Sequence, residues 1–324
     1  MTVLGGVIPV LSTPFDGAER VDEGALAAEI GWILGCGVDG IAIAMVSEIL
    51  RLDVSERERL AESVCSSVAA SVIQVPVVVG VGAEATVLAV RLARHAEGVG
   101  ASAVIAAPPV TTVLDDDELL DYFAAGLDAT TLPVVVQDAS GYVGQSLTLD
   151  LSLALLDGYG ERVWFKPEAQ PLGPRLSRLH QRSGGRARVF EGSGGGALVD
   201  AHARGIVGTM PGPEAPWALV AMWSALEAGD HELARRIAEP LTALLALQTS
   251  LDSYVAVEKH LLVRQGVFGS TRQRGPVGFA LDPQTEVEVD RLMHRLRRAV
   301  ETGAIPAATP GRSDLRRRQS AGSA

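Results

Sequence analysis

Val163-Trp164-Phe165-Lys166-Pro167-Glu168 is a short apolar run that leads to one of only two lysines in the chain. The sequence holds 28 Lys and Arg side chains, and the lysines among them are Lys166 and Lys259. A buried amine can lose its proton and attack a carbonyl, whereas a guanidinium stays charged. Pro167 favours extended backbone before it and offers no amide hydrogen, so we expect a strand to end here. The stretch predicts a Schiff-base lysine at a strand end; the alternative is a lysine that extends from the sheet rim to water.

Seven further β-type runs occur along the chain, and helical stretches alternate with them. The runs cover residues 6–12, 40–44, 75–81, 101–107, 133–138, 187–191 and 205–210. Most are continuous apolar segments such as Val77-Val78-Val79, which is typical of strands buried on both faces of a parallel sheet. Eight strand–helix units favour an α/β fold of the (β/α)8 TIM barrel type over an open doubly wound sheet.

The rest of the chain is predicted to be mostly helical. Helical patterns cover residues 216–228, 231–251, 254–265 and 286–301, with a loop over 266–283. After residue 303 the composition turns to Gly, Ala, Pro, Ser and Arg. We therefore expect a barrel over 1–212, a C-terminal helical extension over 213–302 and a disordered tail over 303–324.

Composition excludes several classes of function. The chain is 47% hydrophobic, enough for a large core, and its net charge of −11 argues against a nucleic-acid or membrane-surface partner. Cys36 and Cys65 are too few for a disulfide framework. The N-terminus lacks the basic region and the cleavage site of a signal peptide, and no apolar run reaches membrane length. We expect a cytoplasmic protein that binds a small molecule.

In a TIM barrel the chemistry lies at the C-terminal ends of the strands. Polar side chains at the predicted ends are Ser47, Glu48, Gln137, Asp138, Lys166, Glu168, Ser193 and Thr209. The glycine-rich loop 192–196 is interpreted as room for substrate rather than as a phosphate site. All six histidines fall on predicted helices without ligand spacing, so no metal is expected. No dinucleotide-binding glycine motif follows the first strand, so no cofactor is expected either.

These landmarks resemble a known family. The order of Thr13-Pro14-Phe15, Gly37–Gly40, Ser47-Glu48, the strand ending at Asp138, Lys166 and the segment 205–211 is similar to the dihydrodipicolinate synthase / N-acetylneuraminate lyase family. The resemblance covers about residues 5–300. It implies a class I lyase in which Lys166 forms an imine with a 2-keto acid, and a homo-oligomer, either a tetramer or a dimer.

Departures from the family pattern point to one of its branches. The Gly-Thr-Thr-Gly-Glu turn that holds a substrate carboxylate in the family is here residues 44–48, Ala-Met-Val-Ser-Glu. The family's strand-five tyrosine falls at Gln137, its following arginine falls near Tyr142, and a further tyrosine is replaced in the segment 110–112. The pattern most resembles the branch that contains 2-keto-3-deoxy-L-arabonate dehydratase.

Three hypotheses follow from this resemblance. The first is a dehydratase of a 2-keto-3-deoxy sugar acid, and the second is a pyruvate-dependent aldolase with another, less polar substrate. The third is a family member that has lost turnover and only binds ligand. With the relay tyrosine replaced, Glu168, Tyr142, Ser47 or a bound water is expected to move the protons. Glu168 lies two residues after Lys166 and on a regular strand would share its inward face, with helix capping as the alternative.

Overall fold

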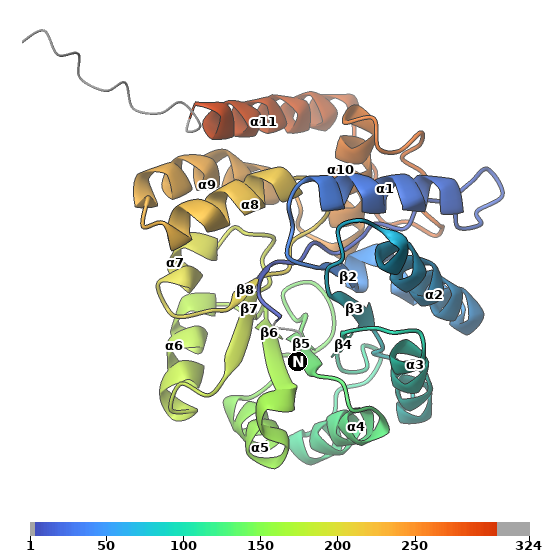
Figure 1. Cartoon of the computed structure of the whole chain (residues 1–324), viewed down its shortest axis with the longest axis vertical. Coiled ribbons are helices and arrows are strands. Elements are labelled where there is room, and N and C mark those ends of the chain that lie inside the picture. Colours follow the sequence, from blue (N-terminus) through green and yellow to red (C-terminus); the bar gives the residue numbers. More distant parts are fainter. Residues whose placement is uncertain (1–3, 303–324) are drawn as a thin grey trace, which may run out of the picture.

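Eight parallel strands form a ring at the centre of the computed structural model, which describes residues 4–302 (Figure 1). The strands are β1 (Gly6–Val7), β2 (Ile41–Ile43), β3 (Val77–Gly80), β4 (Ala103–Ala106), β5 (Val134–Asp138), β6 (Val163–Pro167), β7 (Arg188–Glu191) and β8 (Gly208–Thr209). Their neighbours run in the order β1-β8-β7-β6-β5-β4-β3-β2. A parallel bridge between Val10 and Ala42 joins the two ends of this order. The predicted (β/α)8 TIM barrel is confirmed.

Alternation along the strands divides the core into two layers. Inside the barrel lie residues such as Val78, Val135 and Trp164, and Trp164 stacks on Phe190 with ring centroids 5.7 Å apart. The residues between them on the strands, such as Phe165, pack outward against the helices. Since side chains alternate along a strand, the parity that places Trp164 inside also places the Lys166 side chain inside.

Eleven helices surround the strands in the part of the chain that the structure describes. They are α1 (Glu23–Gly35), α2 (Val54–Ala70), α3 (Thr86–Gly98), α4 (Asp116–Ala129), α5 (Leu149–Tyr159), α6 (Leu172–Arg182), α7 (Leu198–His202), α8 (Pro216–Glu227), α9 (His231–Leu245), α10 (Leu251–Arg264) and α11 (Pro283–Glu301). Short 3-10 turns are η1 (Met45–Ser47), η2 (Ile49–Arg51) and η3 (Gly160–Arg162). Side-chain caps fix several helix starts: Asp53 accepts from Glu56 N before α2, and Ser250 accepts from Ser253 N before α10. The sequence pattern missed the Ser250 cap and placed the start of α10 three residues late.

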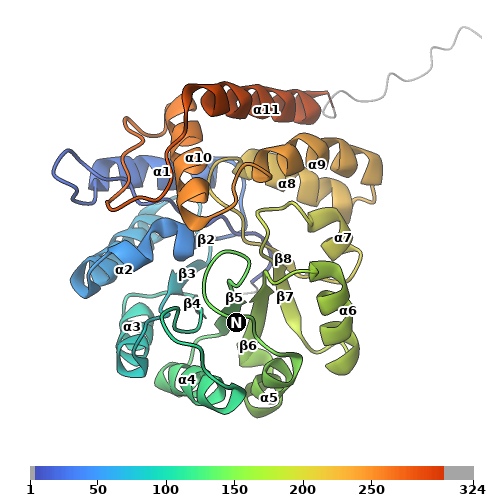
Figure 2. The ribbon, with the colours of Figure 1, turned by 180° about the vertical axis from the view of Figure 1, so that it is seen from behind.

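The C-terminal helices lie together along one side of the barrel, at the top of Figures 1 and 2. α8 follows β8 and packs on β1 and α9, and α9 packs on α11. α10 contacts η1, which follows β2 at the C-terminal end of the barrel. This contact carries α10 to the end of the barrel where the strand-end residues gather. The division of the chain at residue 212 stays a prediction, and the predicted tail 303–324 lies outside the described residues.

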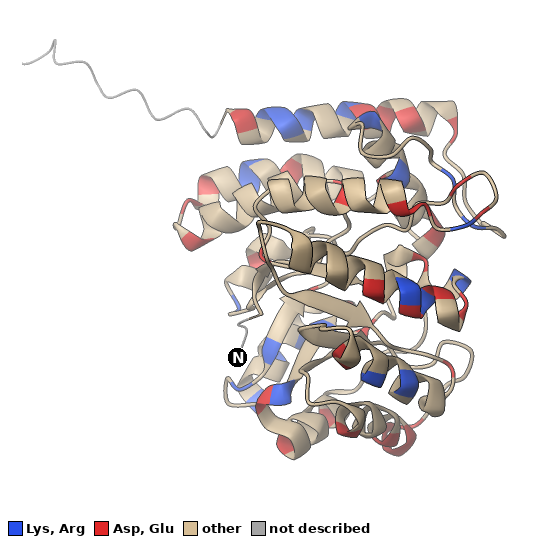
Figure 3. Cartoon of the chain, turned by 45° about the vertical axis from the view of Figure 1, so that its right-hand side comes forward, with Lys and Arg blue, Asp and Glu red and all other residues tan. Residues whose placement is uncertain are grey.

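Charged side chains lie mainly on the helices and loops, and α11 carries both signs (Figure 3). Both lysines are nevertheless buried. Lys259 has no exposed side-chain surface and donates to Glu48 and to the carbonyl of Arg272, 2.7 Å away. Burial lowers the pKa of Lys259, and the Glu48 carboxylate opposes that effect. Arginine thus supplies the surface cations of the chain, and both lysine side chains lie inside the fold.

Among residues 4–302 no helix is both long and apolar enough to cross a membrane.

Glu29 on α1 is a fully buried carboxyl group whose Oε1 accepts from Ser12 N at 2.8 Å, while Oε2 has no partner among the described residues. Burial raises the pKa of Glu29 well above 4.5, against the lowering effects of the Ser12 amide and Lys259. The folded protein therefore keeps a proton that the unfolded chain releases. The stability from this protonation is present below about pH 4.5 and is lost as pH rises toward the folded-state pKa.

We predict that Glu29→Gln, which keeps the acceptor for Ser12 N and cannot ionise, gains stability relative to the wild type as pH rises above about 4.5. The difference in free energy of unfolding should grow by about 1.4 kcal/mol for each pH unit between the two pKa values. Urea unfolding of both proteins at about pH 5, 6 and 7 measures it. A difference that stays constant over this pH range would mean that Glu29 is ionised in the fold, as it is in the unfolded chain.

Candidate active site

A buried network of polar side chains surrounds Lys166 at the end of β6. Lys166 Nζ donates to Glu168 Oε1 at 2.5 Å, and both side chains are about 95% buried. Gln137, paired with Lys166 across β5 and β6, donates from Nε2 to the same oxygen at 2.7 Å. The Gln137 amide also lies 3.3 Å from the hydroxyl of Tyr142. The inward direction of the strand-end side chains therefore brings Lys166, Glu168 and Gln137 together, and the turn after β5 adds Tyr142.

The environment of this network favours proton transfer. Burial raises the pKa of Glu168 above its ordinary value, although Lys166, Gln137 and Tyr142 each lower it. Burial raises the pKa of Tyr142 well above its usual range, and the nearby Glu168 carboxylate is the second largest cause of this shift. A carboxyl group with a raised pKa beside an amine can take a proton from it and return one later. Glu168 is the group best placed to do so.

Glycines of the loop after β7 leave room for this network. A Cβ atom on Gly192 would lie 2.7 Å from Glu168 Cγ and 3.1 Å from Lys166 Cγ. Gly194 has a φ of +69°, and a Cβ there would meet Leu245. Gly192 and Gly194 line a cavity together with Lys166, and the expectation that this loop leaves room for substrate stays a prediction. The cavity volume is about 30 Å³.

The other walls of the cavity come from five parts of the chain. They include Val10, Ala44, Met45, Val46, Gln137, Tyr142, Met210, Pro211, Gly212, Tyr254 and Glu258. Met45 and Val46 stand where the family pattern has threonines, so this wall is apolar. The surface near Lys166 is therefore mixed: apolar toward β2 and polar toward β5 and α10.

Sequence reasoning missed the residues that α10 contributes. Tyr254 and Glu258 are four residues apart, so they share one face of the helix, and both line the cavity. The Tyr254 ring lies 5.9 Å from that of Tyr142, and burial with the surrounding carboxylates raises the pKa of Tyr254 to about 12. Their i, i+4 spacing was visible in the sequence, but nothing there showed that α10 reaches the strand ends.

Ser47 and Glu48, expected to bind substrate, make structural contacts here. The Ser47 hydroxyl donates to the Leu11 carbonyl and accepts from Ala44 N at 3.2 Å. Glu48 has a left-handed backbone with a φ of +54° and pairs with Lys259 and, at 3.5 Å, with Arg51. Neither side chain lines the cavity that holds Lys166. Their roles in binding stay predictions.

Ser193 and Thr209 both bind the carboxylate of Glu191 at the end of β7. Thr209 Oγ1 donates to Glu191 Oε2 at 2.6 Å, and Ser193 donates its backbone N to Oε1 at 2.8 Å. Gly195 N donates to Oε2 at 3.0 Å. Glu191 thus holds the glycine-rich loop to β8. Ser193 and Thr209 shape the loop beside Lys166 rather than line the cavity itself.

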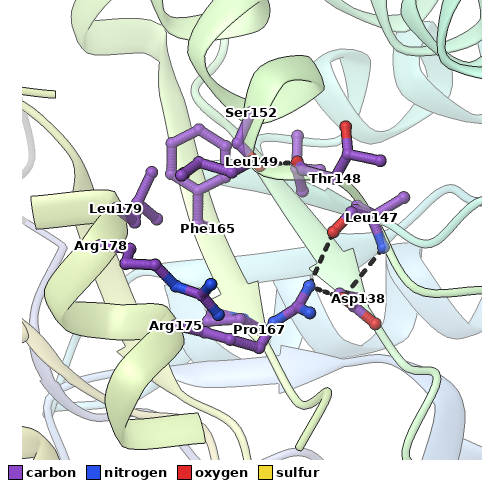
Figure 4. A pocket seen from close by; sticks show the side chains of 11 residues that line it. Asp138, Leu147, Thr148, Leu149, Ser152, Phe165, Pro167, Arg175, Arg178 and Leu179 are labelled. Carbon is purple, nitrogen blue, oxygen red and sulfur yellow. Dashed lines mark hydrogen bonds and ion pairs between the residues drawn. The ribbon is translucent and has the colours of Figure 1, made fainter. Parts of the chain in front are cut away.

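Asp138 lies on the outward face of β5, because parity turns it away from Gln137. Its carboxylate accepts from Leu147 N at 3.0 Å and from Arg175 at 3.3 Å, which anchors the segment that carries Tyr142 (Figure 4). Behind it a second cavity of about 210 Å³ lies between α5 and α6, with Arg175 and Arg178 on one side. Asp138 therefore supports the site from behind the barrel wall.

Within residues 4–302 no group of three or more His, Cys, Asp or Glu side chains is placed to hold a metal ion.

Comparison with known proteins assigns the chain to a family. The model of the dihydrodipicolinate synthetase family matches residues 3–295. The chain belongs to this family.

Relatives with different activities are similar to it at comparable identity. A 4-hydroxy-tetrahydrodipicolinate synthase of Rhizobium meliloti is 29% identical over 290 residues, which cover 88% of this chain and 96% of that protein. An L-2-keto-3-deoxyarabonate dehydratase of Azospirillum brasilense is 27% identical over 300 residues, which cover 90% and 94%. The crystal structure of dihydrodipicolinate synthase from Rhodopseudomonas palustris superposes with a TM-score of 0.81 at 25% identity over 90% of this chain and 98% of that one. The chain is a lyase of this family. Its sequence identity to the synthase and to the dehydratase is too similar to distinguish between their reactions.

Glu168→Gln tests the proton-transfer role of Glu168. The amide keeps the shape and the contact with Lys166 but cannot take up a proton, so imine formation with a 2-keto acid should slow by about 10²–10⁴. The rate of borohydride-trapped adduct formation, read by intact mass, measures it. Glu232→Gln on the exposed start of α9 is the matched control and should keep the wild-type rate. Equal rates in both variants would remove Glu168 from the chemistry.

Proposed function

We propose that this protein is a class I lyase that acts on a 2-keto acid through an imine on Lys166. The observation that carries the proposal is the buried Lys166 amine, 2.5 Å from Glu168 in a cavity at the C-terminal end of the barrel. An amine in this position can reach a carbonyl carbon, and the acid beside it can move the proton that the reaction requires. The family to which the chain belongs supports the same reaction class.

The mechanism follows from the chemistry of an amine and a carbonyl. Neutral Lys166 attacks C2 of the 2-keto acid, the acid form of Glu168 protonates the C2 oxygen, and the resulting carboxylate takes the proton that the amine loses. Glu168 then returns a proton to the C2 hydroxyl, which leaves as water and gives a cationic imine. The imine acidifies C3, and removal of a C3 proton produces an enamine. From the enamine, a protonated C4 hydroxyl can depart as water.

Dehydration of a 2-keto-3-deoxy sugar acid is the reaction that the site favours. The condensation reaction of the synthases relies on a strand-five tyrosine and on hydroxyls that hold a carboxylate, whereas this chain has Gln137, Met45 and Val46 at those places. Elimination from an enamine needs only one group to protonate the departing hydroxyl, a role open to Glu168 or Tyr142. The similarity to an L-2-keto-3-deoxyarabonate dehydratase supports this choice.

A pyruvate-dependent aldolase is the second candidate. The apolar wall made by Met45 and Val46 favours it, because a substrate with a less polar far end would pack there. In that reaction the same enamine arises by cleavage of the C3–C4 bond.

The resemblance also implies a cytoplasmic homo-oligomer, either a tetramer or a dimer. A contact between subunits would cover exposed aliphatic side chains such as Leu50, Val87 and Val113.

We predict that pyruvate or a 2-keto-3-deoxy pentonate, reduced with borohydride, adds a single adduct that maps to Lys166. Lys166→Met should lose the adduct, because no other amine lies in the cavity lined by the described residues. Peptide mapping after intact-mass measurement checks both. Lys259→Met is not a suitable control, because the loss of the buried contact between Lys259 and Glu48 would disturb the fold. The residue that carries the adduct in the wild type is therefore the deciding observation. An adduct that persists in Lys166→Met would remove the imine proposal.

The reaction type has its own test. A 2-keto-3-deoxy pentonate should lose water to give a semialdehyde that a coupled dehydrogenase detects, with or without a strong chelator. Condensation of pyruvate with aspartate semialdehyde should run at least about 10²-fold more slowly than in a synthase, because one positioned proton-transfer group is worth that much. Formation of the condensation product, with every deoxy sugar acid left unchanged, would overturn the dehydratase assignment.

A further inference from the structure

Two buried carboxyl groups lie at the wall of the Lys166 cavity with oxygens that nothing in the described structure binds. Glu258 on α10 has no exposed surface, and neither of its carboxyl oxygens has a partner among residues 4–302. Glu214, in the segment between β8 and α8, is also buried, and its Oε2 has no partner there. Buried polar groups are nearly always satisfied in folded proteins. Three unpaired oxygens at one place therefore indicate a missing partner.

Gly212 shows how close the two groups lie to each other and to the cavity. A Cβ atom on Gly212 would lie 2.3 Å from Glu258 Oε1 and 2.4 Å from Glu214 Oε2. Any larger residue would collide with both carboxyl groups. Gly212 and Glu258 line the cavity that Lys166 also lines. The Glu258 carboxyl group thus lies beside Gly212, and both residues are part of the wall of the space where a substrate on Lys166 would extend.

The charge state of the pair decides what it can bind. Burial raises the pKa of Glu258 well above its ordinary value, and the neighbouring Glu214 adds to that effect. Burial also raises the pKa of Glu214. A raised pKa favours the protonated form, and a protonated carboxyl group offers both a donor and an acceptor to a ligand. The arrangement suits alcohol groups, which donate and accept at once, and it disfavours a second carboxylate.

We propose that Glu258, supported by Glu214, is the subsite that binds the hydroxyl-bearing far end of the 2-keto acid. This inference rests on the imine mechanism proposed above and adds the residues that would recognise the far end of its substrate. The substrate class is a monocarboxylic 2-keto acid with hydroxyl groups beyond C3. A 2-keto acid with a carboxylate at its far end is excluded. Tyr254, one helical turn before Glu258, lies at the same wall with its phenol group.

Three acids separate this subsite from the chemistry at Lys166. Pyruvate has no far end, a 2-keto-3-deoxy pentonate carries hydroxyls there, and 2-oxoglutarate carries a carboxylate. Borohydride trapping at increasing concentration of each acid, read by intact mass, gives a half-saturating concentration. The wild type should be half-saturated by the pentonate at a concentration at least about tenfold lower than by pyruvate or 2-oxoglutarate.

Glu258→Met keeps the length of the side chain and removes its oxygens. It should raise the half-saturating concentration of the pentonate at least about tenfold and leave that of pyruvate within about twofold. It should also unfold at a higher temperature than the wild type, because it removes unpaired buried polar atoms. Glu258→Gln, which still donates and accepts, should fall between the wild type and Glu258→Met for the pentonate. Glu232→Met, on the exposed start of α9, is the control and should change none of these values.

The outcomes distinguish this inference from the proposed function. If pyruvate is trapped on Lys166 but Glu258→Met weakens all three acids equally, or leaves the pentonate unchanged, the subsite is wrong and the imine mechanism stands. Strong trapping of 2-oxoglutarate by the wild type also overturns the subsite alone. If Glu258→Met does not fold, Glu258→Gln decides by the same pentonate-to-pyruvate ratio, and an unchanged ratio rejects the subsite. If the wild type traps no 2-keto acid, the proposed function fails and the inference fails with it.

Discussion

The buried contact between Lys166 and Glu168 is the interaction on which the rest of the site depends. Each side chain is about 95% buried, so each polar group depends on the other for a hydrogen bond that water does not supply. Removing one partner leaves the other unpaired inside the barrel, which costs about 1–3 kcal/mol. Neighbouring residues support this contact: Gln137 donates a hydrogen bond to Glu168, and the absence of a side chain at Gly192 leaves space for Lys166 and Glu168.

Strand parity and helix packing supply the other groups by different routes. Parity turns Gln137, Lys166 and Glu168 inward and Asp138 and Pro167 outward, so one carboxylate lies in the cavity and another anchors the loop behind it. The C-terminal helices add what the strands cannot. α10 packs on η1 and brings an acid and a phenol to the cavity wall, although they follow Lys166 by about 90 residues in the chain.

The site also explains the unusual use of lysine in this chain. Arg supplies the surface cations, while Lys166 lies in the cavity and Lys259 pairs with Glu48 inside the fold. A guanidinium could replace neither amine, because it stays charged and is too large for a single carboxylate contact in a closed space. Buried Glu29, Glu214 and Glu258 add carboxyl groups whose pKa values are raised by burial. The barrel thus concentrates acid–base groups at one end.

The sequence by itself determined the barrel and the position of Lys166. Apolar runs repeat with a regular spacing, and Pro167 marks a strand end; both are local patterns that need no knowledge of distant contacts. It also suggested Glu168, since two residues along a strand share a face. It could not place Ser47 and Thr209 away from the cavity wall, because those hydroxyls are taken up by Leu11 and Glu191 only once the strands are side by side. Only the tertiary structure revealed the roles of Glu214 and Glu258. The packing of α10 against the end of the barrel brings Glu258 close to Glu214 beside Gly212, and no spacing in the sequence encodes a contact between a helix and a loop so far apart.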